Sequence, residues 1–156
     1  MQRSGFSIIE IIISSAIITA TVVATMATFQ TFLEVSRKSA ERTSAALIAE
    51  EGGEIVQIIR DNGWTNYITP LVIGTEYYLN WNGTTFVTTT TPQTTNTNFV
   101  RKVVFSNVYR DGNSDISSSG TLDPETKKIG ITISHTRATS TPILYVESLI
   151  HNTYAN

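Results

Sequence analysis

The chain of 156 residues contains no cysteine, which excludes disulfide bonds and thiolate metal ligands. Charged residues make up only 15%, against about 25% in a typical soluble domain. The formal net charge of −2 gives no bulk attraction to nucleic acid or to an anionic membrane surface. Common catalytic signatures, such as Gly-x-Ser-x-Gly or His-Glu-x-x-His, are absent as well. Because His135 and His151 are the only histidines, we do not expect an enzyme or catalytic residues.

What the sequence does contain is a long apolar run near its N-terminus. Between Phe6 and Leu33 the only ionisable side chain is Glu10, and five charged residues then follow within residues 34–42. A helix over residues 7–29 would be about 35 Å long, which is enough to cross a lipid bilayer. The run therefore predicts a membrane-spanning helix.

The flanks of this run bear on its orientation and processing. Arg3 lies on the short leading side, which favours a cytoplasmic N-terminus and places the chain beyond residue 33 outside. A secretory signal peptide cut near Ala24 or Ala27 is an alternative. Glu10 argues against it, because an acidic residue inside an apolar helix costs free energy and has no use in a plain signal peptide.

The residues Gly5-Phe6-Ser7-Ile8-Ile9-Glu10, followed by Ile11-Ile12-Ile13, resemble the N-terminal motif of type IV pilins and type II secretion pseudopilins. The resemblance implies a prepilin peptidase that cuts between Gly5 and Phe6 and methylates the new Phe6 amine. It further implies a single-pass protein of the cytoplasmic membrane, in contact with lipid. An inner-membrane assembly machinery would then add it to a cell-surface filament of this and other pilins. Roles in attachment, motility or DNA uptake stay open.

Glu10 is the candidate assembly residue. Cleavage would create an α-amino group at Phe6, one helical turn from Glu10 and on the same face. In the family this glutamate pairs with the amine of a neighbouring subunit, which fits the high cost of burying an unpaired carboxylate. The alternative is a residue near the membrane interface whose carboxylate simply reaches water.

The sequence divides into a leader (1–5), a membrane and filament-core helix (6–33), an amphipathic continuation (34–63) and a β-rich domain (64–156). Asn62-Gly63 predicts the end of the helix, since this pair is a good C-terminal cap. Gly52-Gly53 predicts a bend, a close approach to another helix, or a break. Apolar residues at helical spacing outline the predicted buried stripe: Ala40, Leu47, Ile48, Ile55, Ile58 and Ile59.

Beyond the helix the pattern predicts antiparallel β-structure. Alternation is clearest at Ile129, Ile131 and Ile133, within a strand predicted over 127–136. Further strands are predicted over 76–81, 84–89, 99–109 and 143–150, with a two-residue hairpin turn at Asn82-Gly83. The predicted fold class is α+β, a long N-terminal helix packed on a C-terminal antiparallel sheet, which is also the architecture of the pilin family.

Two loops have unusual compositions. Residues 88–98 are rich in threonine and asparagine, which predicts an exposed connection with little apolar surface to bury. Asp111, Asn113 and Asp115 alternate like the start of a calcium loop, but the glycine and glutamate of a complete EF-hand are missing. Asx-turns in a hairpin loop explain these residues equally well. We therefore expect no cofactor, with calcium as the alternative.

Other functions remain as alternatives. A secretion pseudopilin has the same N-terminal motif, and a membrane-anchored domain that never polymerises would have the same apolar run. Many major pilins close their C-terminal region with a disulfide, which favours a minor pilin here. Nucleic-acid binding would need the basic residues of the outer domain to gather on one face, and we do not expect it. These residues are Arg101, Lys102, Arg110, Lys127, Lys128 and Arg137.

Overall fold

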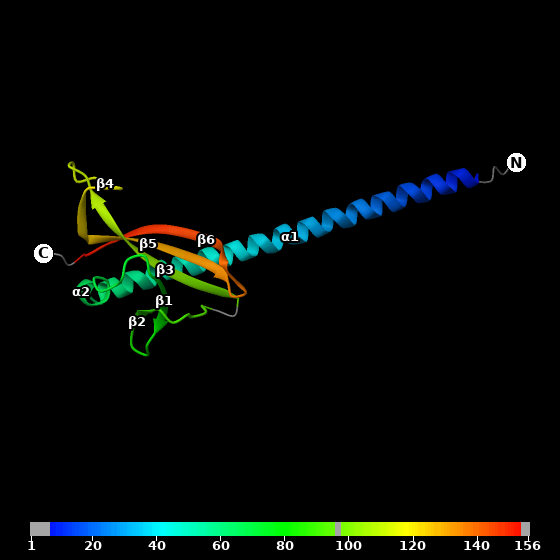
Figure 1. Ribbon diagram of the computed structural model, residues 1–156. Helices are drawn as coiled ribbons and strands as arrows, with labels where there is room; N and C mark the ends of the chain where they lie inside the picture. The colour runs from blue at the N-terminus through cyan, green and yellow to red at the C-terminus, as the bar shows by residue number, and fades with distance from the viewer. Residues whose placement is uncertain (1–6, 96–97, 154–156) are drawn as a thin grey trace. The chain divides into compact units, whose positions relative to one another are not determined.

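The structure, a computed structural model, describes residues 7–95 and 98–153. The chain divides into two compact units, Met1–Glu41 and Arg42–Asn156. Two helices and six strands follow one another along the chain (Figure 1): α1 Ile8–Asp61, α2 Trp64–Tyr67, β1 Glu76–Trp81, β2 Phe86–Thr89, β3 Phe99–Arg110, β4 Ile116–Ser117, β5 Thr121–His135 and β6 Ala138–His151.

Helix α1 is continuous across Gly52-Gly53, so the predicted break does not occur. The helix ends where the sequence predicted. Asn62 N donates to the Ile58 carbonyl at 3.0 Å, and Gly63 then takes a positive φ of 138°. Only glycine adopts this conformation without strain, which is why a helix stops readily before it.

In the first unit, α1 is exposed from Ile8 to Ala40, with Glu41 partly buried. Several of its hydroxyl side chains donate to backbone carbonyls of the same helix. Thr19 Oγ1 donates to the Ser15 carbonyl at 2.8 Å, and Thr25 Oγ1 donates to the Thr21 carbonyl at 2.8 Å. Such bonds to the preceding turn satisfy the hydroxyl groups within the helix itself.

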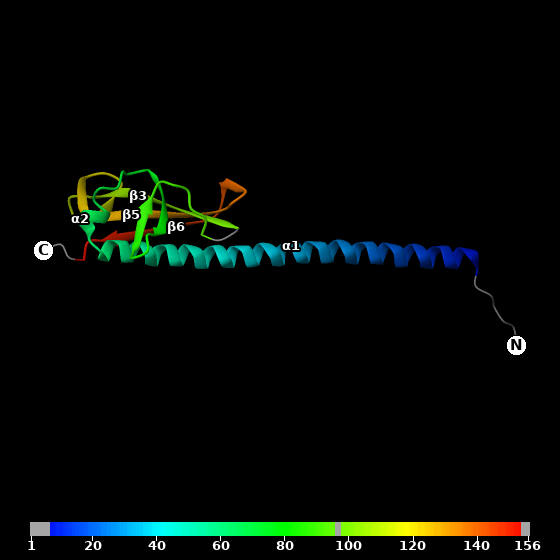
Figure 2. The same ribbon diagram turned by 90° about the horizontal axis from the view of Figure 1, so that it is seen from below.

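The second unit is built on one antiparallel sheet, and the fold class is the predicted α+β arrangement. The strand order is β2-β1-β3-β5-β6, with β4 paired to β3. Strands β3 and β5 form the long centre, with Val103 opposite Ile131 and Phe105 opposite Ile129. Over the stretch of α1 that belongs to this unit, the sheet lies along one side of the helix (Figure 2).

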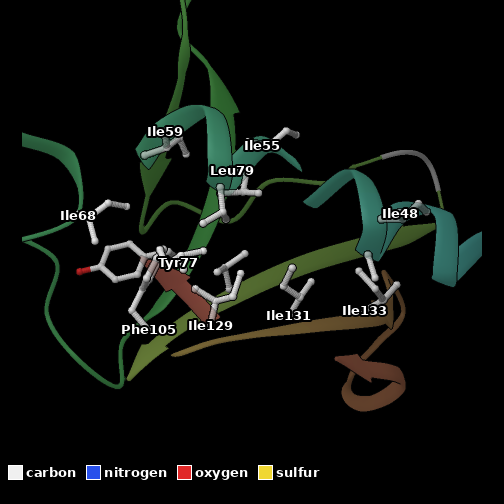
Figure 3. Close-up of a cluster of buried hydrophobic side chains, with 14 of the residues drawn as sticks. Ile48, Ile55, Ile59, Ile68, Tyr77, Leu79, Phe105, Ile129, Ile131 and Ile133 are labelled. Carbon is white, nitrogen blue, oxygen red and sulfur yellow. The ribbon is translucent and has the colours of Figure 1, made fainter. Parts of the chain in front are cut away.

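The hydrophobic core lies between that stretch of α1 and the sheet. Ile55 and Ile59 point from the helix toward the sheet, where Ile131 and Ile133 point back (Figure 3). The rings of Tyr77 and Phe105 meet edge-on, 6.0 Å apart between centroids. Each fully buried isoleucine contributes about 1.5–3 kcal/mol relative to exposure. This contact fixes the second half of α1 on the sheet.

The predicted stripe on α1 is only partly right. Ile48, Ile55 and Ile59 are buried, but Leu47 and Ile58 are 62% and 44% exposed. The remaining buried positions are small residues and a valine, which a search for large apolar side chains misses: Ala45, Ala49, Gly52 and Val56. Small residues let the helix approach the sheet closely. The buried face of α1 therefore contains smaller side chains than the predicted stripe.

The strands differ from prediction mainly at their ends. The β1–β2 connection is a four-residue loop, since Trp81 pairs with Phe86, and the predicted two-residue turn is wrong. Asn82 explains the difference, because its Oδ1 accepts from the backbone N of Thr84 (3.0 Å) and Thr85 (2.9 Å). Strands β5 and β6 begin six and five residues earlier than predicted, and α2 and β4 were not predicted.

Candidate functional site

The predicted cleavage and methylation residues, Gly5 and Phe6, lie outside the described part of the chain. Glu10 lies in the first turn of α1, where its backbone N donates to the Ser7 carbonyl at 3.0 Å. A carboxylate at this position interacts favourably with the positive end of the helix dipole. Glu10 is exposed, so its carboxylate is accessible to a partner.

The helix surface around Glu10 is made of uncharged residues, mostly large apolar side chains with a few serines. Within residues 8–33 the large apolar side chains are between 48% (Val22) and 78% (Ile8) exposed. The helix is long and apolar enough to cross a membrane, judged by length and composition. In the second unit, by contrast, α1 buries its apolar stripe against the sheet. The apolar first half of α1 is thus exposed, whereas the amphipathic second half has one face buried against the sheet.

A stripe of small residues runs along the uncovered half, and the sequence-based prediction did not include it. Ala16, Ala20, Ala24 and Ala27 line one shallow groove on the helix surface together with Thr19 and Val23. Small residues every four positions allow the backbones of two helices to approach closely within a membrane. The repeated small-x-x-x-small spacing was the available signal.

Charged residues begin where the apolar run ends. Lys38 Nζ lies 2.6 Å from Glu34 Oε1, and Arg37 Nε lies 3.9 Å from Glu41 Oε1. The hydrogen bond from Lys38 and its positive charge hold the pKa of Glu34 below its ordinary value. The partners of each pair are one helical turn apart and largely accessible to water, so both pairs contribute little to stability.

In the second unit a buried cation, Arg101, lies beneath α1. Its side chain is 5% exposed, and its Nη1 donates to the Ile48 carbonyl at 3.0 Å. Glu51 Oε2 lies 3.4 Å from the same nitrogen. Burial lowers the pKa of the Arg101 guanidinium, and the Glu51 carboxylate opposes that shift.

Gly52 makes room for this arginine. A Cβ at position 52 would lie 2.7 Å from Arg101 Cδ, whereas a Cβ at Gly53 would meet nothing within 4 Å. Gly52 thus marks a close approach of α1 to the sheet. In the second unit the neighbour at this glycine is the sheet and not, as predicted, another helix. Arg101 fixes the helix to β3 through a charged contact.

The other basic residues of the sheet have polar partners of their own. Lys102 pairs with Glu76 at 2.8 Å, and this hydrogen bond raises the pKa of Lys102. The remaining contacts are Arg110 with Asp123 (2.7 Å), Lys127 with Asn107 (2.8 Å) and Lys128 with Glu147 (3.3 Å). A basic surface for phosphate groups needs cations without such acceptors.

The loop considered for calcium is organised by its own backbone. Asp111 Oδ1 accepts from the backbone N of Asn113 at 2.8 Å and of Asp115 at 3.0 Å, which is the Asx-turn arrangement. Ser114 takes a positive φ of 68° in this turn. Among the residues that the structure describes, no group of three or more His, Cys, Asp or Glu residues is placed to hold a metal ion.

The two histidines lie in the sheet. His135 stacks on Phe99 with 5.5 Å between ring centroids, and His151 Nδ1 lies 3.1 Å from Thr126 Oγ1. Since Phe99 and His135 are directly opposite across β3 and β5, the stacked pair is a cross-strand contact of the kind that stabilises sheets.

No model of a known protein family matches the chain, and no curated protein or solved structure matches it. The long apolar N-terminal helix and the antiparallel sheet are compatible with a pilin-like fold.

Proposed function

We propose that this protein is a structural subunit of a type IV pilus-like filament. In this proposal, a prepilin peptidase cuts between Gly5 and Phe6 and methylates the Phe6 amine. The mature subunit, anchored in the cytoplasmic membrane with its N-terminus inside, then polymerises through residues 6–33 and leaves the membrane as part of a surface filament. The observation that carries the proposal is the uncovered apolar surface of residues 8–33, with Glu10 as its only ionisable side chain.

An uncovered surface of this kind requires a non-aqueous environment. Each large apolar side chain that moves out of water contributes about 1.5–3 kcal/mol, so the segment is not stable as an exposed helix. Lipid covers it before assembly, and neighbouring copies of the same helix cover it in a filament. The small-residue stripe of Ala16, Ala20 and Ala24 supports the second environment, because it favours close helix packing.

Glu10 favours a subunit that associates over a simple membrane anchor. A carboxylate within an apolar helix costs free energy in lipid, and an anchor gains nothing from it. In a filament the Phe6 amine of a neighbouring copy neutralises it, and removing either charge would leave the other buried and unpaired. A secretion pseudopilin would use the same pair, so it belongs to the same proposal.

Substitution of Glu10 tests the proposal. We expect Glu10→Gln and Glu10→Ala to enter the membrane normally but to be lost from filaments sheared off the cell. Ser14→Ala, one turn further along the same face, is the matched control and should assemble as the natural chain does. Membrane fractions and sheared filaments are compared by immunoblot. Normal incorporation of both Glu10 variants would show that the carboxylate has no role in assembly. Absence of the natural chain from the sheared filaments would favour a non-polymerising anchor.

A further inference from the structure

Two Asn-Gly pairs occur in the second unit, and the structure holds them in different ways. Asn62-Gly63 follows the end of α1, and Asn82-Gly83 lies in the loop between β1 and β2. The dipeptide is chemically reactive, because the backbone nitrogen of glycine can attack the asparagine Cγ and close a five-membered ring. Glycine has no side chain to hinder this attack. The two pairs therefore allow a comparison within one chain.

In the β1–β2 loop, two backbone donors hold the side-chain carbonyl of Asn82. Its Oδ1 accepts from the backbone N of Thr84 at 3.0 Å and of Thr85 at 2.9 Å. Two such donors stabilise the negative charge that develops on a carbonyl oxygen when a nucleophile adds to its carbon, as in an oxyanion hole. They also fix which way the amide points, because its nitrogen cannot accept these bonds. The Asn82 Cγ is therefore an activated electrophile.

The attacking nitrogen and the leaving nitrogen at this site are both free to react. Among residues 7–95 and 98–153, neither the backbone N of Gly83 nor Asn82 Nδ2 has a hydrogen-bond acceptor. Both residues are exposed, so hydroxide can reach the Gly83 amide proton and ammonia can leave. Gly83 has a φ of 99°, and a Cβ added there would meet nothing within 4 Å. The loop therefore has room for the new ring.

In Asn62-Gly63, by contrast, the same atoms are bound. Gly63 N donates to the Arg60 carbonyl at 3.1 Å, and Asn62 Nδ2 donates to Thr85 Oγ1 at 2.6 Å. Attack by the nitrogen of Gly63 would break the first bond, and departure of ammonia would break the second. Within the described part of the chain, Asn62 Oδ1 has no donor to activate its carbonyl. The structure thus protects one Asn-Gly pair, although Asn62 is as exposed to solvent as Asn82.

We propose that Asn82 is a site of spontaneous covalent modification, at which the folded protein converts asparagine to aspartate and isoaspartate. Hydroxide removes the Gly83 amide proton, and the nitrogen forms a bond to Asn82 Cγ. The Cγ–Nδ2 bond then breaks, and the leaving nitrogen takes a proton from water and departs as ammonia. Water opens the resulting succinimide at either carbonyl: cleavage of the new bond gives aspartate, and cleavage of the original peptide bond gives isoaspartate. This inference does not depend on the proposed function.

The products change the protein surface at the end of the β1–β2 hairpin. Both add one negative charge, and isoaspartate also lengthens the main chain by one methylene group. The loop is closed by a hydrogen bond from Asn82 N to the Thr85 carbonyl at 3.1 Å, which the longer main chain should disturb. Strand β2 is the outermost strand on this side of the sheet (Figure 1), so we expect the change to loosen an edge and to leave the core intact.

Peptide mapping of the full-length protein in detergent micelles tests the proposal. The folded protein is incubated at neutral and at mildly alkaline pH and is then digested at acidic pH, where the reaction is slow. Mass spectrometry after chromatography should show two products at Asn82 with the mass of the acid, and their yield should rise with pH. We expect conversion at Asn82 to be roughly tenfold or more faster than at Asn62, because only the latter must break hydrogen bonds. Equal rates at the two sites would overturn the inference.

Denaturation separates the effect of the fold from that of the dipeptide itself. In guanidinium chloride both pairs lose their contacts, so conversion should become slower at Asn82 and faster at Asn62 until the two rates are similar. A rate at Asn82 that increases on denaturation would contradict the proposal, because the folded loop would then protect the amide.

Thr85→Val is the matched variant. It removes the hydroxyl that binds Asn62 Nδ2 but keeps the backbone donor to Asn82 Oδ1. Conversion at Asn62 should rise about two- to tenfold, with no change at Asn82. An unchanged rate at Asn62 would overturn the inference. A glycan on Asn82 in the native protein would also overturn it, since Asn82-Gly83-Thr84 fits the acceptor pattern for N-glycosylation and a substituted Nδ2 is not a free leaving group.

Discussion

Replacement of Gly52 or of Gly53 by alanine should change the stability of the second unit in opposite directions, although the two glycines are adjacent in one helix. A Cβ at position 53 meets nothing within 4 Å, but a Cβ at position 52 would lie 2.7 Å from Arg101 Cδ and 3.4 Å from Arg101 Nε. Arg101 cannot move toward solvent freely, because its side chain is only 5% exposed. We therefore predict that Gly53→Ala stabilises the second unit and that Gly52→Ala destabilises it.

The magnitudes follow from separate effects. Gly53→Ala should gain about 0.8–1 kcal/mol from helix propensity alone. Gly52→Ala gains the same amount, but the additional methyl group in a packed site costs about 1–3 kcal/mol. A displaced Arg101 also loses its 3.0 Å bond to the Ile48 carbonyl, and a buried donor left unpaired costs about 1–3 kcal/mol. The net destabilisation by Gly52→Ala is roughly 1–5 kcal/mol.

Denaturant unfolding of the full chain in detergent micelles measures both effects. Trp64 is 6% exposed and reports on the core, so Trp81→Phe is introduced in every variant to leave Trp64 as the only tryptophan. In an Arg101→Ala background, Gly52→Ala should lose most of its cost, because the clashing side chain is gone. Equal stabilisation by both alanines would refute the reasoning, since Arg101 would then give way freely. If Gly52→Ala still destabilises the protein in the Arg101→Ala background, the clash is with a residue other than Arg101.

Two further predictions concern the core and acid stability. Ile59→Ala should lower the free energy of unfolding by about 2–5 kcal/mol, because Ile59 is fully buried. Ile58 is 44% exposed, so Ile58→Ala should lower it by less than about 1 kcal/mol. Denaturant midpoints compare the two variants, and equal losses of stability would contradict the helix orientation. Burial raises the pKa of Asp123, but hydrogen bonds, chiefly from Arg110, outweigh this and hold it below its ordinary value. The carboxylate therefore stabilises the fold above the unfolded pKa, and this contribution is lost as the pH falls through the folded value. Asp123→Asn should be less stable than the natural chain at pH 7 and lose less stability below about pH 4; parallel pH profiles for the two would contradict the assignment.

Local signals account for the parts of the fold that the sequence predicted. The helix end at Asn62-Gly63 is encoded by the residues that form it. The alternation of Ile129, Ile131 and Ile133 likewise places one strand face in the core without knowledge of its neighbours. These features depend on period and turn chemistry, which are properties of short segments.

The features that were missed depend on contacts between distant residues. The sequence groups Arg101 only with the other basic residues of the outer domain, although Arg101 shares the strand phase of Phe99 and Val103, which are buried. Its partners on α1, Gly52 and the Ile48 carbonyl, lie about fifty positions away, so no local pattern announces them. Strand β6 starts at Ala138 in a polar stretch because β5 supplies its hydrogen bonds. Pairing with a neighbour overrides local propensity at such ends.

The central claim, that the N-terminal helix is processed for polymerisation, is tested most directly by the mass of the N-terminal peptide of the protein isolated from its native membrane. The account predicts a chain that begins at Phe6 and has one added methyl group on its amine. A chain that retains Met1 through Gly5, or one that begins near Ala24 or Ala27, would contradict it.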